Sequence, residues 1–190
     1  TLKDGAVSIH NQEWLDRCVG EGFAFQKSSH EKKWISPKDT WQITKTIDEK
    51  NGYPKSAYGA TAWAGAEASM QGAASEKLVP SDVGGLRREQ HLDGSWVNDA
   101  VLKEREKNAG SSAYYVFRDQ FKQALFTTEH PLVTYCTWYS GDNGIGQNGC
   151  SPLMGMPTGN DVGGHLFALI GWINYQGVSC YVVSNSWGIN

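Results

Sequence analysis

The sequence predicts an α+β protein whose N-terminal half is helical and whose C-terminal half is rich in strands. Helical spacing of apolar residues dominates positions 18–128, strand-like apolar runs appear only after position 129, and the two kinds of segment do not alternate. Such segregation favours two subdomains with a cleft between them over repeated βαβ units. We expect one domain over residues 1–190, with a helical subdomain at about 18–128 and a β subdomain at about 129–190 plus the N-terminal segment.

The helical half carries recognisable start signals. Ser36 is an expected N-cap, and Pro37 suits the first turn that follows it. Within the first helix, Gly20 and Gly22 lower helix propensity by roughly 1 kcal/mol each, which indicates close packing at these positions. Trp41, Ile43 and Ile47 are expected to be buried. The expected helices span residues 18 to about 30, 37 to about 51, about 61 to 73, 95–107 and a short stretch through Phe117, Phe121 and Leu125.

Composition excludes several classes of function. The formal net charge of −3 and the lack of a Lys/Arg-rich run argue against a nucleic-acid partner. No apolar run approaches the roughly 20 residues that span a bilayer, and the N-terminus shows no signal-peptide pattern. Hydrophobic residues make up 39% of the chain, which is typical of a packed globular protein. The compartment is left open.

The C-terminal half contains a predicted β-hairpin with polar residues at its base. Residues 131–139 form one expected strand, and the hairpin strands begin at His165 and at Val178, with turn residues 174–177 between them. In antiparallel pairing, His165 at the start of one strand and Asn185 at the end of the other lie side by side. The hairpin therefore pairs an imidazole with an amide.

The four cysteines do not form a disulfide scaffold or a zinc motif. Cys136 and Cys150 flank a Gly-rich loop, and either a bridge or two separate thiols fits them. Cys18 is expected at the N-terminus of a buried helix, where the helix dipole favours a thiolate. We predict neither a metal nor a cofactor. The remaining histidines lack partners at metal-ligand spacing and are expected to be surface or capping residues: His10, His30, His91 and His130.

A thiol, an imidazole and an amide are the parts of a nucleophilic acyl-transfer site. An ordinary thiol is mostly protonated at neutral pH, so a neighbouring imidazole is needed to activate it. In such a site Cys18 attacks a carbonyl, and His165 takes the thiol proton and passes it to the leaving amine. The Asn185 side-chain oxygen accepts a hydrogen bond from the second ring N–H of His165.

These residues resemble the catalytic set of the papain-like cysteine peptidases, in particular their divergent bacterial and viral members. Gln12 precedes Cys18 by six residues, His165 follows it by 147, and Asn185 opens the sequence NSWG, which contains Trp187. The resemblance implies a papain-like two-subdomain fold and an oxyanion hole formed by the Gln12 side chain and the Cys18 backbone N–H. It also implies that Trp187 shields the bond between His165 and Asn185 from water.

The same resemblance assigns substrate-binding positions. Asp16 replaces a glycine of the S1 subsite, where it narrows the subsite or attracts a basic side chain, and Gly59 and Ala60 stand where substrate backbone is usually bound. Gly163, Gly164 and Leu166 fall near the walls of the S2 subsite, which suggests an apolar preference there. The family continues beyond NSWG, so the chain is expected to lack a closing C-terminal strand and to be part of a longer polypeptide.

The expected function is that of a cysteine endopeptidase that hydrolyses peptides or proteins through a thioester acyl-enzyme. One alternative is an inactive or weakly active domain that binds peptide within a larger virion or secreted assembly. A second alternative is an amide acyl transferase on the same triad. No nucleic-acid or membrane partner is expected.

Overall fold

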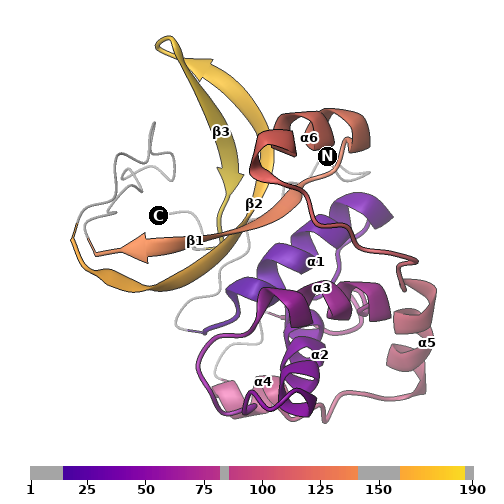
Figure 1. The fold of residues 1–190 in the computed structure, drawn as a ribbon. Helices are drawn as coiled ribbons and strands as arrows, with labels where there is room; N and C mark the ends of the chain where they lie inside the picture. The colour runs from indigo at the N-terminus through magenta and orange to yellow at the C-terminus, as the bar shows by residue number, and fades with distance from the viewer. Residues whose placement is uncertain (1–14, 82–85, 141–158, 187–190) are drawn as a thin grey trace.

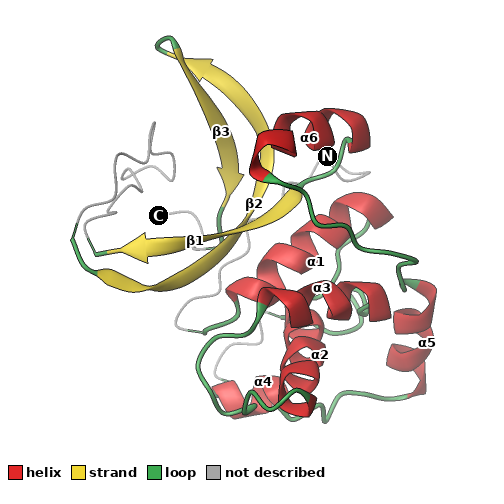
Figure 2. Cartoon of the chain, viewed as in Figure 1, coloured by secondary structure: helices red, strands yellow, loops and turns green. Residues whose placement is uncertain are grey.

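A computed structural model describes residues 15–81, 86–140 and 159–186, and it confirms the α+β class with helices first and strands last (Figures 1 and 2). The sheet lies to one side of the helical half in the view of Figure 1. The elements are α1 (Cys18–Glu31), α2 (Pro37–Lys50), α3 (Ala62–Gln71), α4 (Arg88–Leu92), α5 (Asp99–Lys107), the 3-10 turn η1 (Arg118–Gln120), α6 (Phe121–Thr128), β1 (Leu132–Tyr139), β2 (Asp161–Tyr175) and β3 (Val178–Ser184).

Local capping determines where the long helices begin. Ser36 Oγ accepts the backbone N–H of Asp39 at 3.1 Å, as expected for the N-cap of α2. Thr61 caps α3 in the same way, 3.2 Å from the nitrogen of Ala64. Asn98 caps α5, so this helix begins four residues later than the predicted residue 95. The periodicity identified the helix, whereas the capping side chain fixes its start.

Helix α4 is a feature that the sequence analysis missed. Its five residues fall outside the expected helices, because a helix this short shows no hydrophobic period. His91 belongs to α4 and is only 3% exposed, so its predicted surface position is wrong. Leu92 beside it packs with Leu15 and Trp41. This small cluster attaches α4 to the helical half.

The three strands form an antiparallel sheet in the order β1-β2-β3. Cys136 of β1 lies opposite His165 of β2. The hairpin turn confirms the prediction, since Gln176 and Gly177 have φ of 50° and 83°, the positive values that tight hairpin turns need. Strand β2 begins at Asp161, however, so His165 lies within the strand and not at its start. Asp161, Gly163 and Gly164 also pair with β1 and so extend the strand before His165. The sequence did not indicate this extension, because glycines give only a weak strand pattern.

Helix α1 lies between the sheet and the helices α2 and α3 (Figure 1). A Cβ built on Gly20 would lie 2.6 Å from the Cβ of Trp41 in α2 and 2.9 Å from the carbonyl oxygen of Pro37. A Cβ on Gly22, on another face of the helix, would overlap the side chain of Leu166 in β2. These glycines therefore allow α1 to approach two neighbours at once, as their position in a helix indicated.

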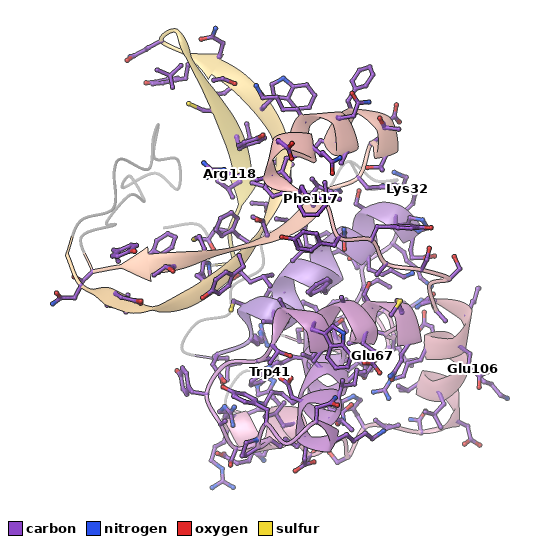
Figure 3. The ribbon with its side chains drawn as sticks, viewed as in Figure 1. Lys32, Trp41, Glu67, Glu106, Phe117 and Arg118 are labelled. Atoms are coloured by element: carbon purple, nitrogen blue, oxygen red, sulfur yellow. The ribbon has the colours of Figure 1, made fainter. Side chains whose placement is uncertain are left out.

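Two core clusters meet on α1. Val19 and Phe23 pack against Leu166, and this cluster joins the helix to the sheet. On the other side of α1, Trp41 is fully buried within the helical half (Figure 3). Glu106 on α5, in contrast, is exposed to solvent (Figure 3). The larger helical cluster comprises Ala24, Ile35, Ile43, Ile47, Ala64, Ala68 and Ala73. Across the described ranges, none of the helices combines the length and apolar character needed to cross a membrane.

A buried carboxylate connects α2 to α5. Asp39 is fully buried, and its oxygens accept hydrogen bonds from the Arg105 guanidinium, from Trp96 Nε1 at 3.2 Å and from the Ala74 backbone N–H at 2.8 Å. A buried charge is tolerated only when it is paired and hydrogen-bonded, and Asp39 meets both conditions.

We predict that Gly20→Ala lowers the free energy of unfolding by about 1–3 kcal/mol, because the added methyl group has no room beside Trp41. Alanine favours helix by roughly 1 kcal/mol over glycine, so a stabilised variant would contradict the packing argument. Urea denaturation followed by circular dichroism measures the change. Glu106→Ala is the control, since alanine at this exposed helical position should alter stability by less than about 0.5 kcal/mol.

Candidate active site

The best-defined element of the site is the pair formed by His165 and Asn185. His165 Nε2 lies 2.7 Å from Asn185 Oδ1, which also accepts the backbone N–H of Ser186 at 2.8 Å. Because Oδ1 can only accept, Nε2 of His165 carries the proton and donates it. Nδ1 is then left with a lone pair. The predicted contact between His165 and Asn185 is confirmed, although His165 lies within β2 and not at its start.

Aromatic side chains enclose the His165 ring. His165 is 5% exposed, and the ring of Trp138 on β1 lies edge-on to it with 5.4 Å between centroids. Phe167 contributes a second ring at 6.0 Å. Burial lowers the pKa of His165, and the hydrogen bond to Asn185 partly opposes this effect. The ring is therefore held as a neutral imidazole with a fixed orientation.

Cys18 is the first residue of α1, as the sequence analysis predicted. Burial raises the pKa of its thiol, and the nearby charge of Asp16 adds to this, while hydrogen bonding with the backbone of Leu166 and Val19 acts in the opposite direction. The expected thiolate is thus not the resting form that this environment favours. The N–H groups at the helix terminus lower the pKa of the Cys18 thiol, but desolvation of the sulfur raises this pKa by more.

Cys18 lies against β2 at Leu166, whose backbone hydrogen-bonds with its thiol. Cys18 packs against the cluster that contains Leu166, the residue next to His165 in β2. Neighbouring side chains of a strand point to opposite faces of the sheet, so Leu166 packs on α1 while the ring of His165 lies with those of Trp138 and Phe167. The start of α1 and strand β2 thus meet at Leu166, and the Cys18 thiol and the His165 imidazole both favour their neutral forms.

The start of α1 offers backbone donors around the sulfur. Its N-cap residue, Arg17, makes no side-chain capping bond. The first N–H groups of a helix have no partner within the helix, and they lie at the positive end of its dipole. The N–H groups of Cys18 and Val19 belong to this turn and interact with the thiol. Such groups suit the stabilisation of an oxyanion that forms beside Cys18.

Asp16 serves a structural role that the sequence analysis did not foresee. Its carboxylate binds Arg88 of α4 with both oxygens, at 2.6 and 2.9 Å, and accepts the backbone N–H of Gly59. It is therefore not available to attract a basic substrate side chain, which corrects the S1 expectation. Arg88 and α4 gave no sequence signal for this role, because the partners are 72 positions apart.

Arg17 is a second buried charge at the start of α1. Its Nε donates to Glu21 at 2.6 Å, and its Nη1 lies 3.3 Å from the carbonyl oxygen of Ser81. Arg17 and Glu21 are both 2% exposed. The spacing of four residues is typical of helical ion pairs, so this contact is one that the sequence could have indicated.

The other predicted substrate-binding residues divide into two groups. Ala60 packs against the cluster that contains Leu166, whereas Gly163 and Gly164 are exposed on β2. Leu166 is 2% exposed and belongs to the core, so its side chain does not form an open wall of the S2 subsite. Gly59 has its N–H bonded to Asp16 and its carbonyl oxygen bonded to Lys45 Nζ at 2.7 Å. The substrate-binding role of Ala60 stays a prediction.

A small hollow lies between α1 and the end of β3. It is lined by residues that include Gly22, Phe25, Leu166, Phe167 and Asn185. Neither Cys18 nor His165 lines it. We do not assign it as the substrate site, because a nucleophile must touch the bond that it attacks.

Several predictions lie outside the described residues. These are the oxyanion role of Gln12, the shielding role of Trp187 and the bridge between Cys136 and Cys150, whose second cysteine is not described. Over the described ranges, no group of three or more His, Cys, Asp or Glu side chains is arranged to hold a metal ion.

Comparison with known proteins adds no relative to this description. No protein-family model matches the chain, and no curated protein sequence matches it.

We predict that Asn185→Ala lowers the pKa of His165 further. The hydrogen bond to Asn185 is what raises this pKa against the effect of burial, so its loss leaves burial unopposed. NMR titration of the His165 ring resonances measures the change. Asn174→Ala, an exposed position further along β2, is the control and should leave the titration as in the wild type. A raised or unaltered pKa in Asn185→Ala would contradict the assigned bond.

Proposed function

We propose that the protein is a cysteine endopeptidase of papain-like fold that cleaves peptide bonds with Cys18 as nucleophile and His165 as base. The observation that carries this proposal is the 2.7 Å contact between His165 Nε2 and Asn185 Oδ1, beside the helix that begins at Cys18. An amide that orients an imidazole, near a thiol at a helix N-terminus, is an arrangement suited to acyl transfer. The substrate is a peptide or protein, and no cofactor takes part.

The proposed reaction starts from the neutral thiol and imidazole. When a peptide carbonyl reaches Cys18, Nδ1 of His165 takes the thiol proton as the sulfur attacks the carbonyl carbon. Asn185 stabilises the resulting imidazolium through the bond to Nε2. His165 then gives the proton to the leaving amine, and the C–N bond breaks to leave a thioester on Cys18. Water, deprotonated by His165, hydrolyses the thioester and restores the thiol.

Backbone N–H groups support the oxyanion in this scheme. The N–H of Cys18 belongs to the unpaired first turn of α1, and the Gln12 side chain is proposed as the second donor. Removing one such donor from an oxyanion hole commonly costs on the order of 10²-fold in rate. The helix thus contributes the nucleophile and part of the transition-state binding.

A second candidate is a domain that binds peptide with little or no turnover. The raised pKa of the Cys18 thiol favours this alternative, since it lowers the fraction of reactive thiolate. An amide acyl transferase would use the same residues and differ only in the acceptor. Incubating the protein with a peptide library, with and without an added primary amine, separates the three cases by their products.

We predict that a thiol-reactive peptidyl epoxide labels Cys18 at one equivalent per chain. Because His165 is needed to remove the thiol proton, His165→Ala should slow the labelling by on the order of 10²-fold. Mass spectrometry of the intact protein and of its digest measures both extent and position. Cys18→Ala should abolish the labelling and the cleavage of library peptides.

The control is Cys180→Ser, which removes a thiol from β3 and should change neither labelling nor cleavage. Labelling at Cys180 instead of Cys18, or labelling of Cys18 at an equal rate in His165→Ala, would exclude the proposed mechanism. Labelling without any peptide cleavage would favour the binding domain.

A further inference from the structure

The segment before the proposed nucleophile is tied to two distant parts of the chain. Asp16 lies two positions before Cys18 and is 6% exposed. Its Oδ1 accepts Arg88 Nε at 2.6 Å, and its Oδ2 accepts both Arg88 Nη2 at 2.9 Å and the backbone N–H of Gly59. One carboxylate therefore binds α4 and the loop at residues 57–60 to the start of α1.

Arg88 extends the same network to the loop and to α2. Its Nη2 also donates to the carbonyl oxygen of Ala57 at 2.8 Å, and its guanidinium lies 5.5 Å from the centre of the Trp41 ring. A planar guanidinium forms such forked contacts, whereas a lysine ammonium does not. Arg88 thus contacts the carboxylate, the loop and the core of the helical half together.

Lys45 of α2 holds the loop from its other side. Its Nζ lies 2.9 Å from the carbonyl oxygen of Ala57 and 2.7 Å from that of Gly59. The next residue, Ala60, packs against the cluster of Val19, Phe23 and Leu166, as Cys18 also does. The loop is consequently held against the start of α1 by contacts that come from Asp16, Arg88 and Lys45.

We infer that the ion pair of Asp16 and Arg88 positions the proposed peptidase site by holding the 57–60 loop against the start of α1 while partly offsetting the carboxylate charge near Cys18. The inference rests on the proposed function, and it makes Asp16 and Arg88 positioning residues that contact no reacting atom. Without Arg88, a buried carboxylate would stand near the sulfur with no opposing charge from α4.

The charges near Cys18 come from several elements. Its own helix supplies the buried pair of Arg17 and Glu21, whose charges balance. Helix α2 supplies Lys45, and β2 supplies the ring of His165, which burial favours in its neutral form. Against this background the charge of Asp16 raises the pKa of the Cys18 thiol. Removing Asp16 or removing Arg88 therefore changes the electrostatics at the sulfur in opposite directions.

The test compares two variants that break the same ion pair. We expect the pH midpoint of Cys18 alkylation by iodoacetamide to fall in Asp16→Asn, which deletes the negative charge, and to rise in Arg88→Gln, which leaves that charge unopposed. The double variant deletes both charges, so its midpoint should lie between those of the two single variants. A purely structural role would shift both single variants in the same direction, and that result would overturn the inference.

Arg88→Lys examines the forked geometry separately from the charge. It should keep the wild-type midpoint but raise KM for a cleaved library peptide by between about tenfold and 10²-fold with little change in kcat, because the loop is held less firmly. If Arg88→Gln fails to fold, Arg88→Lys provides the test in its place. An unaltered KM in Arg88→Lys would then overturn the inference. Arg87→Gln removes an equal charge from the exposed neighbouring position and should change neither quantity.

The alkylation measurement also separates this inference from the proposed function. If Cys18 shows the opposite shifts but the wild-type protein cleaves no peptide, the ion pair is supported and the peptidase proposal fails. If the wild type cleaves peptides and the single variants shift together, the peptidase proposal stands and the ion-pair inference fails.

Discussion

The close packing of α1 against α2 and β2 is the constraint on which the other features depend. At Gly20 and Gly22 the neighbouring elements leave no space for a Cβ, so the helix is fixed from two sides at once. Because Cys18 begins this helix, its backbone is placed as firmly as the core itself. The same contact packs Leu166 of β2 against the first turns of α1. Close packing of this kind transmits small changes in side-chain volume, since protein interiors have little free space.

Such packing carries charged groups into the interior, where each needs a partner. The segment around Cys18 illustrates this need, because Asp16 and Arg17 are both buried and both form ion pairs, with Arg88 and Glu21. Buried pairs often add little net stability relative to apolar residues, but breaking one is costly. They are therefore better understood as devices that fix the position of the helix start than as sources of stability.

Burial also decides how the site is protonated at rest. Desolvation raises the pKa of Cys18 and lowers that of His165, so both groups favour their neutral forms. The opposing contributions come from the first-turn backbone and from Asn185. In the proposed peptidase, attack by Cys18 would therefore include transfer of a proton to His165, and an approaching substrate would reach a thiol and not a preformed thiolate.

The sequence by itself determined the class of fold, the positions of the main helices, the hairpin turn and the pairing of His165 with Asn185. These depend on near neighbours in the chain or on the register of one hairpin, and capping residues such as Ser36 and periodic apolar residues encode them directly. Only the tertiary structure decided the partner of Asp16, the burial of Leu166 and the existence of α4. Asp16 and Arg88 are 72 positions apart, and in the sequence a carboxylate two residues before the proposed nucleophile fits a substrate contact and half of an ion pair equally well. The choice between them depends on which distant group the packed helices bring within reach, and no local pattern specifies that group.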